Sequence, residues 1–275
     1  MIIDAHHHLW DPTRREYPWM AGEALSPIRK PYGLAELRAV TEPAGVTGTV
    51  LVQTVASVSE TAEFLAVTGD LVLGVVGWVN LTAPDIADRL AELREMPGGD
   101  RLVGIRHLVE AEAEPDWLIR PDVRRGLAAL ADAGLVYDLL VNPAQYPSVL
   151  RAVDALPGGS FVLDHAGKPG VPSPDWTKWI HELAERSTVV CKLSGLVTEV
   201  SWTDWQVADL APVAARVLDA FGPDRVLFGS DWPVCELAAS YGEVLSAARA
   251  LTTGLSSSER DAVFGDNARR VYGLP

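Results

Sequence analysis

Met1-Ile2-Ile3-Asp4-Ala5-His6-His7-His8-Leu9-Trp10 is the stretch of the chain that decides between two folds. The apolar run Met1–Asp4 predicts a strand, and three histidines follow it closely. In an open, doubly wound α/β sheet, the turn after the first strand usually carries a glycine-rich G-x-G-x-x-G motif that binds phosphate. No such motif occurs near these histidines. The stretch therefore favours a closed α/β barrel over an open sheet.

Seven further apolar runs along the 275 residues have the length and β-branched composition of strands. They are Thr47–Gln53, Leu71–Val79, Leu102–His107, Leu135–Val141, Ser160–Asp164, Thr188–Leu193 and Arg225–Gly229. Most are continuously apolar, which is typical of parallel strands covered on both faces. Amphipathic stretches such as Pro84–Met96 and Pro121–Ala133 separate them and predict helices. With about 34 residues per strand–helix unit, we expect an α/β fold with a single (β/α)8 TIM-barrel domain over residues 1–275.

The composition limits the kinds of partner. The chain has 37 acidic and 23 basic residues, a formal charge of −14. Phosphate binding needs clustered Lys and Arg, so we expect neither a nucleic acid nor a membrane partner, but a small-molecule substrate. Cys191 and Cys235 are too few for a disulfide framework. No secretory signal or membrane span is visible, so we expect a cytoplasmic protein. Whether it forms a homo-oligomer stays open.

Histidines collect at the expected strand ends. His6, His7 and His8 follow the first strand, His107 ends the fourth and His165 follows the sixth, whereas His181 lies in an expected helix. In a barrel, the carboxyl ends of the strands hold the active site. Five of the six histidines therefore point to one catalytic region.

His6 and His8 have the spacing of two metal ligands. Two residues apart on a strand, their side chains project to the same face and can both reach a Zn²⁺ ion. His165 and Asp231, also at strand ends, complete a candidate site for one divalent metal, with Zn²⁺ as the expected ion. The alternatives are a remnant of an affinity tag or polar residues satisfied near the barrel rim. His7 is expected to face the helix layer instead.

Six motifs spread along the chain resemble the amidohydrolase superfamily, specifically its amidohydrolase-2 branch. They are Asp4–Trp10, Tyr17–Trp19, Gly104–His107, Leu163–Pro169, Lys192–Gly195 and Phe228–Pro233. Within that branch the chain is most similar to the sugar-lactone hydrolases, such as fuconolactonases and rhamnonolactonases. The resemblance implies a (β/α)8 barrel.

The family resemblance also implies the chemistry of the catalytic centre. His6, His8 and His165 would line it, and Asp231 would act as the acid and base. Superfamily members that bridge two metals use a carboxylated lysine at the end of the fourth strand. That strand ends here in Arg106-His107, so we expect one metal at most. Some relatives hydrolyse lactones without a metal, so a metal-independent site stays open.

Arg106 and His107 are candidates at the end of the fourth strand. The fixed fork of donors of Arg106 suits a substrate carbonyl, hydroxyl or carboxylate. The alternative is a structural ion pair with a barrel carboxylate such as Asp138. His107 is expected to be catalytic, either by polarising the lactone carbonyl or by holding Arg106 in place.

Aromatic and amide side chains complete the expected substrate contacts. Trp19 and Trp232 could stack on the apolar face of a sugar ring, although most large aromatic residues belong to the core. Gln53 ends the second strand and is expected to contact substrate. Lys168 is as well suited to organising its loop as to touching substrate.

Three functions fit these residues. The first is a metal-assisted hydrolase that opens a sugar-derived (aldono) lactone to the hydroxy acid, with water activated by Asp231. The second is a metal-dependent decarboxylase of the same branch, which would need cations to hold a substrate carboxylate, and only Arg106 is obvious. The third is a non-enzymatic barrel that binds a sugar or a metal. The sequence favours the first.

Overall fold

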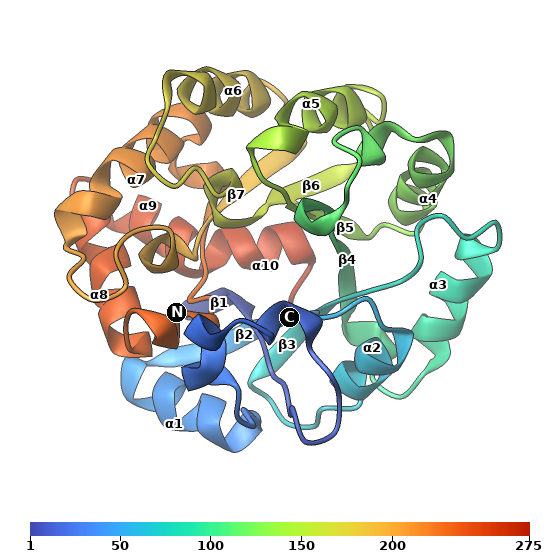
Figure 1. Ribbon diagram of the computed structural model, residues 1–275, viewed down its shortest axis with the longest axis horizontal. Helices are drawn as coiled ribbons and strands as arrows, with labels where there is room; N and C mark the ends of the chain where they lie inside the picture. Colours follow the sequence, from blue (N-terminus) through green and yellow to red (C-terminus); the bar gives the residue numbers. More distant parts are fainter.

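The computed structural model describes residues 1–275 and confirms the barrel. Eight parallel strands pair in the order β1 to β8, and helices surround them (Figure 1). The strands are β1 (Ile2–His7), β2 (Val46–Val52), β3 (Val72–Gly77), β4 (Leu102–Leu108), β5 (Val136–Leu140), β6 (Ser160–Leu163), β7 (Val189–Leu193) and β8 (Val226–Phe228). Seven of them match the expected runs to within two residues at each end, whereas β1 continues three residues further, through His7.

The helices follow the strands in alternation. They are α1 (Leu34–Ala44), α2 (Val58–Leu65), α3 (Ile86–Glu95), α4 (Pro121–Asp132), α5 (Tyr146–Asp154), α6 (Pro174–Ala184), α7 (Val207–Phe221), α8 (Tyr241–Leu251), α9 (Ser257–Asp261) and α10 (Asn267–Tyr272). The expected helices at 84–96 and 121–133 correspond to α3 and α4. No helix combines the length and the apolar sequence that a bilayer crossing requires.

The sequence of α4 explains its bounds. Pro121 occupies the first turn, where its fixed φ is favourable and its missing N–H costs nothing. Val123, Leu127 and Leu130 recur on one side and are buried against the barrel. Gly134, just beyond the helix, has a φ of +67°, which glycine adopts without the Cβ penalty of other residues.

The barrel closes between β8 and β1 through the residues that follow β8. The N–H of Asp231 donates to the carbonyl of His6 at 2.8 Å, and the N–H of His8 donates to the carbonyl of Trp232 at 2.7 Å. These two bonds bring Asp231 alongside the first strand. Closure of the barrel and assembly of the site therefore depend on the same segment.

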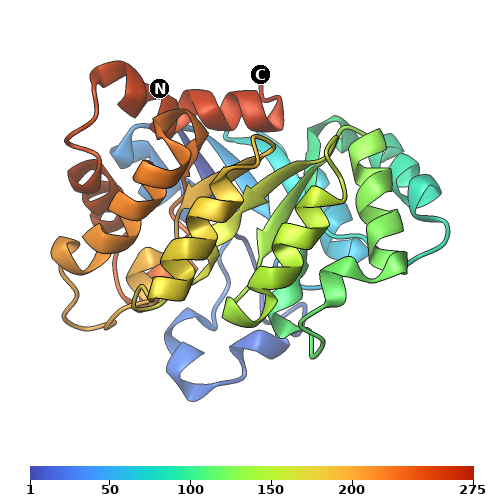
Figure 2. The same ribbon diagram turned by 90° about the horizontal axis from the view of Figure 1, so that it is seen from above.

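The two ends of the barrel differ in polarity. Apolar residues from the strands form a layer near the amino end, and α10 and the residues after it cover this layer with Ala268, Tyr272 and Leu274. Figure 2 shows α10 and both chain termini at one end, with the segment between β1 and α1, in blue, at the opposite end. The buried histidines lie toward that opposite end, where the strands finish.

Candidate active site

A cavity opens at the carboxyl ends of the strands, the end of the barrel where this fold places its active sites. Polar groups from strand ends and following loops line it together with apolar walls: His8, Trp19, Thr54, Arg106, Leu108, Glu110, Ala111, Leu140, His165, Lys168, Gly195, Thr198, Glu199, Asp231 and Val234. Of the residues predicted from the sequence, the lining includes His8, Arg106, His165, Asp231, Trp19 and Lys168.

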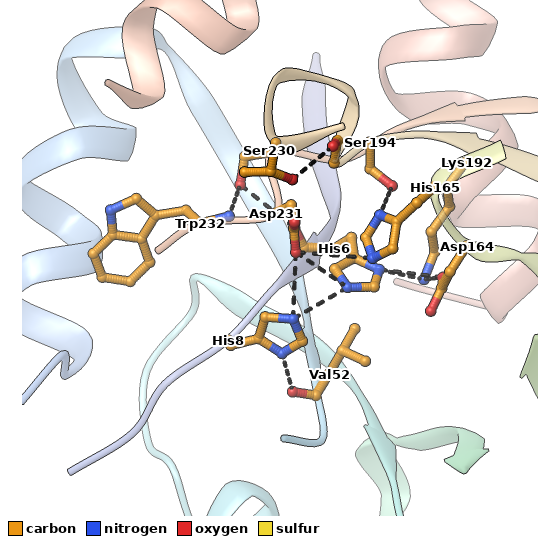
Figure 3. Close-up of polar contacts among 12 residues, drawn as sticks. His6, His8, Val52, Asp164, His165, Lys192, Ser194, Ser230, Asp231 and Trp232 are labelled. Atoms are coloured by element: carbon orange, nitrogen blue, oxygen red, sulfur yellow. Dashed lines mark hydrogen bonds and ion pairs between the residues drawn. The ribbon is translucent and has the colours of Figure 1, made fainter. Parts of the chain in front are cut away.

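His6, His8, His165 and Asp231 form a compact group, which we call the histidine–aspartate cluster (Figure 3). One carboxylate oxygen of Asp231, Oδ1, lies 3.5 Å from His8 Nε2, 3.7 Å from His6 Nε2 and 3.9 Å from His165 Nε2. The two nitrogens His6 Nε2 and His8 Nε2 are 3.2 Å apart. The structure thus brings together all four residues that the sequence predicted as metal ligands.

Two members of the cluster have unusual backbone conformations that orient their side chains. Asp231 has a φ of +57° and His165 a φ of +54°, a left-handed region that few non-glycine residues occupy. Such strain is typical of functional sites, where the surrounding structure enforces it. Gly195, which follows β7, leaves room for His165, because a Cβ atom there would lie 2.6 Å from His165 Nδ1.

A hydrogen bond determines which nitrogen of His8 carries the proton, whereas His6 has a cation on each side. His8 Nδ1 lies 2.8 Å from the carbonyl oxygen of Val52, which only accepts, so Nδ1 donates and Nε2 keeps its lone pair. Arg106 has only donors, and its Nη1 lies 3.2 Å from His6 Nε2. On the other side of the ring, His6 Nδ1 lies 3.1 Å from Lys192 Nζ, which also only donates, and 3.2 Å from Asp164 Oδ1. Both nitrogens of His6 therefore face donors, and these contacts do not select one tautomer.

This arrangement leaves acceptors facing one another. His6 Nε2, His8 Nε2 and Asp231 Oδ1 converge, and these three residues have ligand atoms close enough to share an ion. Imidazole nitrogen and carboxylate oxygen are ligands that Zn²⁺ accepts. The lone pair of His8 Nε2 and the carboxylate oxygen of Asp231 face each other at 3.5 Å, and a cation between them would relieve their repulsion, so the residues fit one divalent metal. A second grouping, His6, Asp164 and His165, shares His6 with the first, and its Asp164 is already paired with cations.

The histidines and the aspartate of the cluster have the protonation states that metal ligands need. Burial lowers the pKa values of His6, His8 and His165, so neutral imidazoles predominate near pH 7. Burial alone would raise the pKa of Asp231, but the neighbouring histidines outweigh it and hold that pKa below its ordinary value. The sequence could not tell which effect dominates. Asp231 is therefore ionised at neutral pH.

Arg106 is held from two sides. Its Nε donates to Gln53 Oε1 at 3.0 Å, and its Nη1 donates to Asp164 Oδ2 at 3.0 Å. The ion pair with a barrel carboxylate that the sequence offered as an alternative is present, but its partner is Asp164 and not Asp138, which pairs with Lys192. Gln53 is fully buried and absent from the cavity lining, so the expected substrate contact is corrected to support of Arg106.

Lys192 and Asp164 are buried charges that sequence reasoning left without a role, and Asp138 is a buried charge that it paired with the wrong cation. Lys192 Nζ lies 2.5 Å from Asp138 Oδ2 and 3.0 Å from Asp164 Oδ1. A signal was present, because Asp138 and Lys192 interrupt the apolar strands β5 and β7. Charged residues inside such strands must find partners, since unpaired buried charges are costly.

His107 is directed away from the cavity, which corrects the expectation that it is catalytic. Its ring stacks on Trp117 with centroids 4.3 Å apart. Trp78 Nε1 donates to His107 Nδ1 at 3.0 Å, and His107 Nε2 lies 2.7 Å from a carboxylate oxygen of Glu112. Neither proposed task, polarising a carbonyl or holding Arg106, is compatible with these contacts.

Trp232 also differs from expectation. It is buried, and its indole Nε1 donates to Glu236 Oε1 at 2.8 Å while the ring packs against Tyr32. Figure 3 shows the indole pointing away from the histidine–aspartate cluster. Trp19, by contrast, lines the cavity, and Lys168 lies there in an ion pair with Glu110 at 2.7 Å. His7, as expected, turns away from the cluster and lies 2.9 Å from Thr49 Oγ1.

Comparison with known proteins agrees with this architecture. The family model described as Amidohydrolase matches residues 3–274. A protein of Burkholderia multivorans named L-fucono-1,5-lactonase is 39% identical, over 99% of this chain and 96% of its own. A second protein of that name, from Burkholderia ambifaria, is 33% identical over 98% and 94%. The crystal structure of an amidohydrolase from Burkholderia multivorans with bound zinc is 38% identical, with a TM-score of 0.94 and 100% of both chains covered.

Proposed function

This chain belongs to the amidohydrolase family, and on that premise we propose that it hydrolyses a sugar-derived lactone to the corresponding hydroxy acid. Two relatives named L-fucono-1,5-lactonase, similar over nearly their whole length, support this substrate class. The observation that carries the proposal is the position of Asp231, an ionised carboxylate in the cavity lining and beside three neutral imidazoles.

Asp231 moves the proton in the proposed reaction. As the oxygen of a water molecule attacks the carbonyl carbon of the lactone, Asp231 accepts a proton from that water. When the ester C–O bond breaks, the ring oxygen leaves as an alkoxide and accepts that same proton from Asp231.

Other side chains would orient the lactone. Arg106 reaches the cavity with its guanidinium fixed by Gln53 and Asp164, so it can donate to the carbonyl oxygen as negative charge develops there. His6, His8 and Asp231 would hold a zinc ion, with His165 beside them. Bound there, the metal would supply Lewis-acid polarisation and lower the pKa of water.

The wall of the cavity suits a sugar better than an anion. Trp19 offers an apolar ring face to the C–H groups of a sugar. Glu110 and Glu199 add carboxylates that can accept hydrogen bonds from hydroxyl groups. The decarboxylase alternative would need cations for a substrate carboxylate, whereas Lys168 is paired with Glu110 and Arg106 with Asp164.

A panel of aldonolactones tests the proposal. Purified protein would be incubated with five- and six-membered lactones of several sugars, and acid release would be followed in weak buffer. We expect turnover of at least one sugar lactone. Release of CO₂ from unsaturated carboxylic acids, without lactone turnover, would identify the decarboxylase instead.

The metal is tested separately on protein purified without a histidine tag. We expect about one zinc per chain by elemental analysis, and less in His6→Ala and His8→Ala variants. A metal content near zero with full activity would contradict the proposal of a metal site and leave the histidines as groups that bind substrate.

A further inference from the structure

Asp4 is a fully buried carboxylate that the proposed reaction does not use. It belongs to β1 and is absent from the cavity lining, and its two oxygens accept four hydrogen bonds. Oδ1 accepts from the backbone N–H groups of His6 at 3.1 Å and Ser230 at 2.8 Å. Oδ2 accepts from the hydroxyls of Ser230 at 2.6 Å and Tyr241 at 3.0 Å. Asp4 therefore joins β1 to α8 and to the residue that precedes Asp231.

The burial of this carboxylate needs a reason beyond packing. Moving a carboxylate out of water costs free energy that its hydrogen bonds must offset, and an apolar side chain would avoid that cost. An ionised carboxylate accepts hydrogen bonds at both oxygens, whereas the amide of asparagine accepts at only one. Two of the four donors belong to Ser230, so Asp4 fixes this residue through both its backbone and its side chain.

Ser230 in turn holds the backbone on the far side of Asp231. Its hydroxyl donates to Asp4 and accepts the N–H of Trp232 at 3.0 Å (Figure 3). On the near side, the N–H of Asp231 donates to the carbonyl of His6 at 2.8 Å. The planar peptide groups before and after the Cα atom of Asp231 are therefore both held, and φ and ψ of Asp231 are the only soft angles between them. These contacts account for the φ of +57° at Asp231.

The left-handed conformation of Asp231 places its carboxylate in the histidine–aspartate cluster. Asp231 Oδ1 lies 3.5 Å from His8 Nε2 and 3.7 Å from His6 Nε2. Because φ sets the direction of the Cα–Cβ bond relative to the preceding peptide group, a negative φ would carry Oδ1 away from these nitrogens. A residue other than glycine leaves the left-handed region unless its surroundings enforce it.

We propose that Asp4 is a positioning residue that acts through Ser230 to hold Asp231 in its left-handed conformation and thereby directs the carboxylate at the cluster. The proposal rests on the proposed function only for its kinetic consequence, because the conformation of Asp231 can be tested without substrate. A role limited to joining β1 to the segment after β8 would also explain a buried Asp4. Such a role would lower stability in general and would not change the conformational preference at position 231.

The preference for glycine over alanine at position 231 measures this conformation. With Ser230 present, we expect the folding equilibrium constant of Asp231→Gly to exceed that of Asp231→Ala by about 5-fold or more, because alanine is costly at positive φ. In the Ser230→Ala background we expect the preference to vanish, since the peptide group before Trp232 is released. Urea unfolding with a chelator present measures all four proteins, so neither metal nor substrate affects the comparison.

Ala166→Gly is the matched control, because Ala166 also has a positive φ, +53°, but lies in the turn after β6. Its effect on stability should be the same with and without Ser230→Ala. Asp4→Ala releases Ser230 and should also abolish the preference at position 231. Should that variant fail to fold, Ser230→Ala decides alone. An undiminished preference for glycine at position 231 in the Ser230→Ala background would overturn the proposal.

If lactones are substrates, kinetics give a second readout. We expect Ser230→Ala to lower kcat at least about 10-fold with little change in KM, because Ser230 lies outside the cavity lining and a misplaced catalytic group slows the reaction. In protein that already carries Asp231→Asn, the same substitution should change kcat less than about 3-fold, since residues that act through one group are not additive. Equal fractional losses in the two backgrounds would also overturn the proposal. Lactone inactivity of the unmodified protein would leave the unfolding comparison intact and count only against the proposed function.

Discussion

Adjacent residues of β4 have opposite surroundings because side chains alternate across a strand. Arg106 points into the barrel and reaches the cavity, whereas His107 points outward and packs between Trp78 and Trp117. The pair shows why residue type at a strand end does not by itself identify a catalytic group. The alternation places Arg106 at the cavity and His107 in the packing of the helix layer.

His107→Ala should therefore affect stability rather than turnover. The substitution removes a stacked ring and two polar contacts, so we expect the free energy of unfolding to fall by about 1–3 kcal/mol. We expect kcat/KM for the best lactone to stay within about 3-fold of the unmodified protein. Thermal unfolding and steady-state kinetics on the same preparations decide. A 100-fold loss of turnover with an unchanged melting temperature would return His107 to the catalytic machinery.

Among the elements, the turns after β6, β7 and β8 assemble the site. Each carries a residue with positive φ: His165 after β6, Gly195 after β7 and Asp231 after β8. His165 Nδ1 lies 2.9 Å from Ser194 Oγ, so the β7 turn also orients the ring that the β6 turn supplies. Neighbouring turns are thus coupled through His165.

Gly195→Ala tests that coupling. Its Cβ would lie 2.6 Å from His165 Nδ1, so the imidazole must move away from its present position. We expect kcat to fall at least ~10-fold, because misplaced catalytic groups are costly. Gly134→Ala is the control, since Gly134 has nearly the same φ, +67° against +66°, and nothing within 4 Å of the added atom. Equal activity of the two variants would show that His165 tolerates the shift.

The positions and the pairing of the strands explain which predictions from the sequence succeed. Periodicity and composition locate all eight strands, and parallel pairing brings their carboxyl ends together, so the cluster of His6, His8, His165 and Asp231 was predictable. Partners inside the barrel were not, because one sequence does not reveal which residues of β5 and β7 face each other at the same level. The Lys192–Asp138 pair is such a case. The direction of Trp232 depends on a turn whose geometry leaves no periodic pattern.

At the scale of the whole molecule, the barrel buries imidazoles that water would otherwise protonate in mild acid. His7 is the clearest example outside the cluster, because it is fully buried and packs against Thr49. Burial lowers the pKa of His7 from 6.5 to about 3. The same side chain regains its ordinary pKa near 6.5 in the unfolded chain.

This difference predicts the direction of acid destabilisation. Between about pH 6.5 and 3 the unfolded chain binds a proton that the folded protein excludes, so the His7 contribution is complete above pH 6.5 and is lost as the pH falls. From pH 7 to 5 we expect the unmodified protein to lose about 2 kcal/mol more unfolding free energy than His7→Gln. Urea unfolding with a chelator present measures both. Identical losses would mean that His7 titrates normally in the folded state.

The central claim is that Asp231 exchanges a proton with water and the leaving alkoxide, and Asp231→Asn tests it most directly. The amide keeps the shape of the side chain and much of its hydrogen bonding but cannot accept the proton. With the best lactone of the panel, we predict that kcat falls at least ~10²-fold, while the melting temperature changes little. A variant that keeps more than about a tenth of the original kcat would remove Asp231 from the mechanism and contradict the account.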